Sequence, residues 1–321
     1  MRTARLFIRA AALAIGLGVA GLAAMIAFGT AAPPKPLASI NDPFRQVDFS
    51  GLPAIAFATA RDGTKLAYRA YPAGSEKVVL LIHGSSASGA SMHVLAGALQ
   101  AAGITVFVPD MRGHGESGRR GDIDHVGQMD DDIADLMAVF RPLFPAAQFS
   151  LVGFSSGGGF TLRIAGGPYG ALFDRYVLIS PFLRHDAPLN RPGGAWVAPF
   201  IPRIIGLAIL DRFGIHRFEG LPVIAFALAP EAKKFLTASY SYRLNKNFKP
   251  HDDYLGNVHR APRPIALVAG QADELFYTDR YAGILQAARP DLGVTLVPGE
   301  GHIGMILDPA GVQAVARLVS S

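Results

Sequence analysis

The feature of this sequence that most restricts its fold is the alternation of short apolar runs with stretches of helical periodicity. The runs that we interpret as strands are residues 77–83, 104–110, 148–154, 175–180, 264–270 and 294–298. Helical patterns cover residues 92–103, 125–140, 279–288 and 309–319. Strands that alternate with helices in this way form βαβ units, so the pattern predicts an α/β fold with a mostly parallel central sheet flanked by helices.

Two more apolar runs, residues 55–60 and 65–71, flank the turn sequence Arg61-Asp62-Gly63-Thr64. Short apolar runs joined by a turn of this kind form a β-hairpin. We therefore expect a hairpin at the first edge of the sheet, which makes that edge mixed rather than parallel.

The alternating pattern breaks between Pro181 and Pro262, where Pro, Gly and apolar runs such as 200–210 and 221–228 are frequent. Long structureless loops are uncommon in compact domains, so this segment must have structure of its own. We interpret residues 181–262 as a helical cap over the carboxyl edge of the sheet. Residues 55–180 and 263–321 then form the core.

The N-terminal segment, residues 1–34, has the character of a membrane anchor or a signal segment. No charge occurs between Ala10 and Pro34, and about 20 apolar residues suffice to span a bilayer. The preceding basic residues, Arg2, Arg5 and Arg9, favour the cytoplasm, which places the following domain in the periplasm or outside the cell. Secretion after cleavage near the small residues 29–32 is the alternative. Residues 35–54 are expected to be a linker.

The charge balance and the cysteine count exclude several classes of protein. The net charge of +5 includes three arginines in the first 34 residues, and the rest of the chain carries 27 basic and 25 acidic residues. A nearly neutral domain gives no reason to expect nucleic-acid binding. The chain has no cysteine, and it has neither a phosphate-binding glycine-rich loop nor a zinc motif, so we expect no cofactor.

Four aspartates on the helix predicted over 125–140 are the nearest approach to a metal site: Asp130, Asp131, Asp132 and Asp135. They lie off the apolar face of that helix. We therefore expect a solvated acidic face, and no metal.

The sequence Gly153-Phe154-Ser155-Ser156-Gly157 fits the pattern G-x-S-x-G. It directly follows a predicted strand and precedes a predicted helix, which is the context of a nucleophile elbow. The glycines allow the tight turn that exposes the Ser155 hydroxyl. The backbone N–H of Ser156, at the helix start, is a candidate donor to an oxyanion.

The sequence His83-Gly84-Ser85 ends another predicted strand and supplies the second oxyanion candidate, the backbone N–H of Ser85. His83 itself follows a central strand, so we expect a packing or loop-ordering role for it rather than that of a base.

A nucleophilic serine needs a base and a carboxylate that orients the base. Asp273 follows the predicted strand 264–270, and His302 follows the strand 294–298. The chain order Ser155, Asp273, His302 is the order of α/β-hydrolase triads. Glu274 is a rival for the acid, because it is adjacent to Asp273.

The segment Asp110-Met111-Arg112-Gly113-His114-Gly115-Glu116-Ser117 resembles the D-x-R-G-H-G-x-S stretch of monoacylglycerol lipase and lysophospholipase-like hydrolases, which are grouped with serine aminopeptidase S33-type sequences. The resemblance runs from about residue 55 to the C-terminus and is weakest across residues 181–262. It implies a triad of Ser155, Asp273 and His302, a cap that shapes an acyl pocket, and a structural role for His114. After Gly84 the chain continues with Ser-Ser-Ala-Ser, which differs from the G-E-H-like continuation common in monoacylglycerol lipases.

The function that we predict is hydrolysis of carboxylic esters, such as lysophospholipids or monoacylglycerols, through an acyl-enzyme on Ser155. A peptidase or amidase that uses the same triad is one alternative. A non-catalytic binding protein on the same fold is another. The expected partners are a small-molecule or lipid-like ester and, through the N-terminal segment, a membrane.

Overall fold

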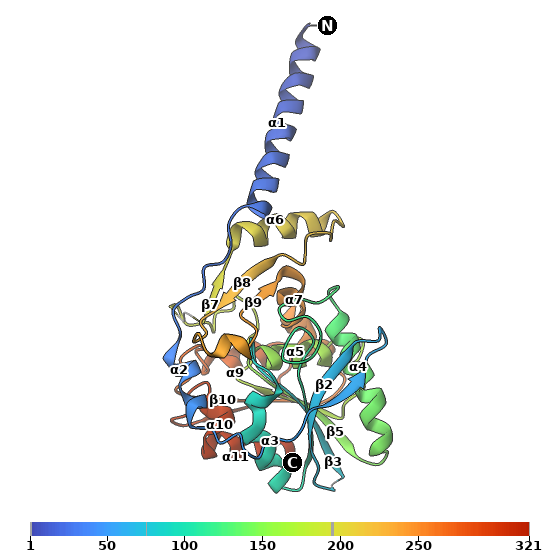
Figure 1. Cartoon of the computed structure of the whole chain (residues 1–321), viewed down its shortest axis with the longest axis vertical. Helices are drawn as coiled ribbons and strands as arrows, with labels where there is room; N and C mark the ends of the chain where they lie inside the picture. Colours follow the sequence, from blue (N-terminus) through green and yellow to red (C-terminus); the bar gives the residue numbers. More distant parts are fainter. Residues whose placement is uncertain (1, 75, 194–195, 321) are drawn as a thin grey trace.

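The computed structural model describes residues 2–74, 76–193 and 196–320. Its main feature is an eight-stranded sheet of order β1-β2-β4-β3-β5-β6-β10-β11 (Figure 1). In chain order the strands are β1 (Ala56–Thr59), β2 (Lys65–Tyr71), β3 (Lys77–Ile82), β4 (Thr105–Pro109), β5 (Gln148–Phe154), β6 (Arg175–Ile179), β10 (Ile265–Gly270) and β11 (Gly293–Val297). The predicted α/β fold class is confirmed.

The sheet is parallel from β4 to β11, and only its first edge is antiparallel. β1 pairs with β2, and β2 pairs with β4, in antiparallel register. The turn at residues 60–64 joins β1 and β2, where Gly63 adopts a φ of 85°. This confirms the predicted hairpin edge.

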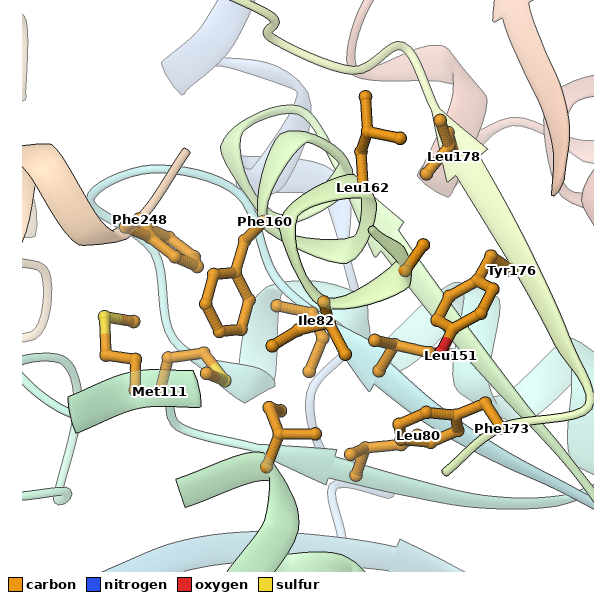
Figure 2. Close-up of a cluster of buried hydrophobic side chains, with 14 of the residues drawn as sticks. Leu80, Ile82, Met111, Leu151, Phe160, Leu162, Phe173, Tyr176, Leu178 and Phe248 are labelled. Carbon is orange, nitrogen blue, oxygen red and sulfur yellow. The ribbon is translucent and has the colours of Figure 1, made fainter. Parts of the chain in front are cut away.

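Helices cover both faces of the sheet because successive strand residues point to opposite sides. On β3, Leu80 and Ile82 face one layer of helices, and Val79 and Leu81 face the other. The first layer contains α4 (Gln128–Phe140), α5 (Ser156–Ala165), α8 (Tyr254–Arg260) and α9 (Arg280–Leu285). The second contains α3 (His93–Ala101), α10 (Gly304–Leu307) and α11 (Pro309–Ser320). Figure 2 shows Phe160 of α5 packed near Ile82 in the first layer.

The segment that we expected to be a helical cap contains strands as well as helices. β7 (Val197–Pro199), β8 (Pro222–Phe226) and β9 (Ser239–Ser241) form a small antiparallel sheet. The helices of this segment are α6 (Ile201–Arg212), α7 (Tyr242–Asn247) and, near its end, α8, which packs against α5 in the first core layer rather than in the cap. The apolar run 221–228 is therefore a strand and not a helix, because periodicity alone does not distinguish a short apolar strand from a buried helical segment.

The N-terminal helix α1 (Arg2–Ala27) extends away from the rest of the molecule, and its base meets α6 (Figure 1). Within it, Arg5–Ala27 is long and apolar enough to cross a membrane, with a mean hydropathy of 2.2. Residues 28–54 return along the cap to the core and include α2 (Ala38–Asn41). Asn41 fastens this segment to the cap, because its amide donates to the Ala227 carbonyl at 2.9 Å and its side-chain oxygen accepts from the Ala229 N–H at 3.2 Å.

The expectation of a solvated acidic face on α4 is wrong for two of its four aspartates. Asp130 and Asp132 are buried. Asp130 accepts hydrogen bonds from Arg163 at 2.8 and 2.9 Å, and Asp132 accepts from Arg112 at 2.6 and 2.8 Å. Helical periodicity places a residue on a face but does not reveal a distant arginine that neutralises it.

The pair between Asp130 and Arg163 predicts a large loss of stability when one partner is removed. Asp130→Ala leaves a buried guanidinium without its carboxylate, which costs about 3–5 kcal/mol. Thermal unfolding followed by circular dichroism measures this as a fall of several degrees in Tm. The control is Asp291→Ala, which breaks the pair between Asp291 and Arg289 on a carboxylate that is 77% exposed, and which should leave the Tm nearly unchanged. Equal effects of the two substitutions would contradict the prediction.

Candidate active site

Ser155 lies at the sharp turn between β5 and α5, in the context that the sequence predicted. Its backbone has a φ of 55° and a ψ of −119°, a conformation that non-glycine residues rarely adopt. A Cβ on Gly153 would lie 2.2 Å from the Gly157 carbonyl oxygen, and one on Gly157 would lie 2.3 Å from the His83 carbonyl oxygen. The two glycines of the motif are therefore required by close backbone approach, and the turn leaves the Ser155 side chain at the wall of a cavity.

The loop after β3 lies against Ser155. The Cβ of Ser155 is 3.4 Å from the position that a Cβ on Gly84 would occupy. In this loop the Ser86 N–H donates to the Tyr240 hydroxyl at 2.6 Å. Among the described residues, the backbone N–H groups of Ser85 and Ser156 have no hydrogen-bond acceptor, and both residues line the same cavity as Ser155. These are the two donors that the sequence analysis singled out.

The cap holds this loop through side chains as well as backbone. The Trp196 indole N–H donates to Ser85 Oγ at 2.9 Å. Ser86 Oγ donates to the Thr237 carbonyl at 2.7 Å, and the Thr237 N–H donates to the Ser86 carbonyl at 2.8 Å. No local sequence pattern indicates these roles of Trp196, Thr237 and Tyr240, because they depend on how the cap folds back over β3.

His83 and His114 are buried, and their imidazole rings form hydrogen bonds that hold the surrounding loops. His83 Nδ1 donates to the Gly84 carbonyl at 2.8 Å, and its Nε2 accepts from the Met111 N–H at 3.1 Å. His114 Nε2 accepts from the Tyr240 hydroxyl at 2.6 Å. Burial lowers the pKa of His83, and burial together with the adjacent His83 ring holds the pKa of His114 well below its usual value. Both imidazoles are therefore neutral, and the loop-ordering role expected of His83 is confirmed.

His302 and Asp273 form a buried pair. His302 Nδ1 lies 2.7 Å from Asp273 Oδ2, and Asp273 Oδ1 accepts the backbone N–H groups of Leu275 and Phe276 at 2.9 and 3.0 Å. Burial opposes ionisation of Asp273, but the electrostatic interaction with His302 and these hydrogen bonds outweigh it and hold the pKa of Asp273 below its usual value. An ionised Asp273 fixes the tautomer of His302, with the proton on Nδ1.

Glu274 contacts the backbone of His302 and not its ring. Its Oε2 accepts the His302 N–H at 2.9 Å. Of the two adjacent acids, Asp273 is thus the one placed to orient the imidazole. Glu274 instead holds the loop that carries it.

The three residues follow β5, β10 and β11, so all three lie at the carboxyl edge of the parallel strands. The His302 ring packs on Phe154, the residue before Ser155, with ring centroids 4.8 Å apart. In the part of the chain that the structure describes, no hydrogen bond joins Ser155 Oγ to His302. Such contacts in free enzymes are often long and tighten when substrate binds.

A cavity of about 380 Å³ lies between Ser155 and the cap. Its size suits a small molecule or part of a lipid chain. Most of the lining is apolar, and it includes Phe182, Trp196, Val197, Pro199, Ile201, Ile204, Ile224, Phe226, Phe248, Leu275 and Phe276. The charged side chains at its wall are basic, namely Arg191 and Lys249.

One group of side chains in the described residues has the spacing of metal ligands: Asp211, His216 and Glu219, in and after α6. Lys246 donates to Asp211 and so supplies a positive charge at this group. The group lies outside the lining of the cavity at Ser155.

Comparison with known proteins agrees with this architecture. Residues 73–216 match the family model of serine aminopeptidase, S33. No curated protein sequence matches the chain. The fold is similar to that of a soluble variant of monoglyceride lipase from Saccharomyces cerevisiae, with a TM-score of 0.65 and 18% identity over 85% of this chain and 97% of that one.

Two other solved structures show the same fold. A monoacylglycerol lipase from Paleococcus ferrophilus has a TM-score of 0.60 and 20% identity over 79% of this chain and 98% of its own. A bromoperoxidase from Bacillus anthracis has a TM-score of 0.59 and 20% identity over 84% and 100%. Their different names illustrate that fold alone does not select a reaction. The sheet order, the strand-to-helix turn at Ser155 and these structural likenesses show that this chain has an α/β-hydrolase fold.

Proposed function

We propose that the protein is a serine hydrolase that cleaves carboxylic esters with lipid-like acyl groups. The observation that carries the proposal is the buried Asp273–His302 pair at the same sheet edge as Ser155. The unpaired N–H groups of Ser85 and Ser156 supply the remaining requirement, donors for a developing oxyanion.

The reaction proceeds by two acyl transfers. His302 Nε2 takes the proton of Ser155 Oγ as that oxygen attacks the ester carbonyl, and the N–H groups of Ser85 and Ser156 bind the oxyanion. Collapse of the tetrahedral intermediate breaks the carbon–oxygen bond, and His302 returns its proton to the departing alcohol. Water, deprotonated by His302, then attacks the acyl-enzyme and releases the acid and free Ser155. Asp273 stays ionised throughout and stabilises the imidazolium.

The apolar cavity supports an acyl group as the part of the substrate bound beside Ser155. Its wall has basic side chains, Arg191 and Lys249, and no carboxylate among the described lining residues. A peptidase that holds the free amine of its substrate needs an acidic group there. This observation favours an ester over an aminoacyl substrate, although the S33 match keeps the amidase reading as the alternative.

We further propose that α1 is retained as a membrane anchor. Its last turn packs into a hydrophobic cluster with the cap, in which Ile26 is buried against Leu207 and Val223. Cleavage after residue 29 would expose this cluster. The anchor places the domain in the periplasm or outside the cell.

A fluorophosphonate probe tests the nucleophile. The unmodified protein should react covalently with the probe, and Ser155→Ala should not react. Ser156→Ala is the matched control, because it changes the adjacent serine but keeps the backbone N–H, and it should still be labelled. Absence of labelling on the unmodified protein would favour a non-catalytic binding protein.

The two adjacent acids are separated by their effects on turnover. Asp273→Asn loses the charge and the tautomer control at His302, so kcat for a p-nitrophenyl ester should fall by about 10⁴. Glu274→Gln keeps an oxygen that accepts the His302 N–H, so its effect should be less than about tenfold. A larger loss for Glu274→Gln than for Asp273→Asn would reverse the assignment.

Substrate chain length tests the acyl pocket. Each buried methylene contributes up to about 0.8 kcal/mol, so kcat/KM for p-nitrophenyl octanoate should exceed that for the acetate by at least about tenfold. Hydrolysis of aminoacyl-naphthylamides in parallel measures the amidase alternative. Equal rates for all ester lengths would contradict an acyl pocket.

A further inference from the structure

The cap helix α6 has an exposed face that is almost entirely apolar. Ile201, Ile205 and Ile209 recur every four residues, and so lie along one side of the helix, with exposed fractions of 51%, 46% and 40%. Pro202 and Ala208 are exposed between them. Phe213, Ile215 and Phe218 continue the apolar surface beyond the helix. We call this set, from Ile201 to Phe218, the α6 face. Contiguous exposed apolar side chains of this kind are typical of interaction sites.

The base of α1 is fixed on the same helix. Arg203 of α6 is buried and donates to the carbonyls of Ile26 at 2.7 Å and Gly29 at 2.6 Å, and also to that of Pro222 in the cap. Its positive charge lies at the C-terminal end of α1, where the helix dipole favours a cation. A Cβ on Gly206 would come within 2.8 Å of the Ile26 side chain, so the two helices cross closely at this glycine. The contact sets the direction of α1 relative to the cap.

The direction of α1 determines where the α6 face would lie relative to a bilayer that α1 crosses. α6 lies across the base of α1, at the end of the domain from which α1 extends (Figure 1). The apolar side chains from Leu6 to Val19 are exposed along α1. Its 26 residues span about 39 Å, more than the roughly 30 Å of a hydrocarbon core. The helix is therefore long enough to cross the hydrocarbon core and still place its base at the interface.

The active-site cavity reaches the same surface. Ile201 is half exposed and also lines the cavity that contains Ser155. Val197, Pro199 and Ile204 continue the cavity wall below it. The apolar lining is thus continuous with the α6 face at the first turn of the helix.

We propose that the α6 face lies in the outer interface of the membrane that α1 crosses, so that the cavity at Ser155 opens toward that leaflet and receives lipid esters from it. Amphipathic helices that bind membranes lie in the plane of the interface, with their apolar face toward the acyl chains. Arg212 and Arg217, exposed at the end of α6 and in the loop beyond it, are placed to meet lipid phosphates. The membrane contact stands on the geometry alone, and the lipid substrate rests on the proposed function.

The absence of cysteine from the chain permits a direct test by site-specific labelling. Ile209→Cys and Leu143→Cys are each labelled with a nitrobenzoxadiazole in the full chain, reconstituted in phosphatidylethanolamine–phosphatidylglycerol vesicles. Leu143 is 62% exposed on the core after α4 and serves as the matched control. The label at residue 209 should shift to shorter wavelength and be quenched by nitroxide lipids, and the label at residue 143 should be quenched only by aqueous nitroxide.

Two results would overturn the membrane contact. One is a label at residue 209 that responds like the label at residue 143. The other is energy transfer between labelled copies at residue 209 without quenching by nitroxide lipids, which would assign the α6 face to a second copy of the chain. Neither readout requires hydrolysis, so each is independent of the proposed function.

A second measurement tests lipid entry. Ile205→Glu/Ile209→Glu should lower hydrolysis of a vesicle-borne lipid ester by at least about tenfold and change hydrolysis of p-nitrophenyl butyrate by less than about twofold. Leu143→Glu should change neither rate. Retained activity on the short ester shows that the double variant is folded. Unchanged hydrolysis of the vesicle-borne ester would overturn entry from the leaflet, whatever the depth of the label.

Discussion

The close backbone approach at Ser155 is the constraint on which the rest of the site depends. The turn from β5 into α5 requires a positive φ at Ser155, and the neighbouring chain leaves no room for side chains at Gly153 and Gly157. Such a conformation persists only when the surrounding structure holds it. Here the central strands β3 and β6 flank β5, and the Ser155 N–H donates to the Ile179 carbonyl at 2.9 Å. A residue in a rarely adopted conformation is thus held between the central strands of the sheet.

Polar groups buried between core and cap extend this rigidity to the loop after β3. The Tyr240 hydroxyl accepts from the Ser86 N–H and donates to His114, whose neutral state burial maintains. A buried hydrogen-bond network of this kind is costly to leave partly unsatisfied, so it favours a single arrangement of its members. Because Tyr240 and Trp196 both belong to the cap, the cap contributes to the loop that presents the Ser85 N–H as well as to the cavity wall.

Three buried arginines likewise use polar contacts to attach one helix or loop to another. Arg163 joins α5 to α4 through Asp130, Arg112 joins the loop after β4 to α4 through Asp132, and Arg203 joins the cap to α1. Each guanidinium is buried and finds either a carboxylate or several carbonyls, as its planar set of donors requires. Packing of apolar faces alone does not determine such specific attachments. Through Arg203, the base of the apolar helix α1 is attached to α6, which forms part of the cavity wall.

Local pattern in the sequence was enough to predict the strands of the core, its longer helices, the hairpin edge, and the strand–turn–helix context of Ser155, because periodicity and glycine spacing express local backbone geometry. It did not predict the short helices α8 and α10. Position after a predicted strand, together with chain order, also singled out His302 and the adjacent pair Asp273 and Glu274. Only the tertiary structure separated Asp273 from Glu274, buried Asp130 and Asp132, folded residues 221–228 as a strand, and brought Trp196 and Tyr240 to the loop after β3. Each of these depends on a partner distant in the chain, and no local pattern records which side chain that partner presents.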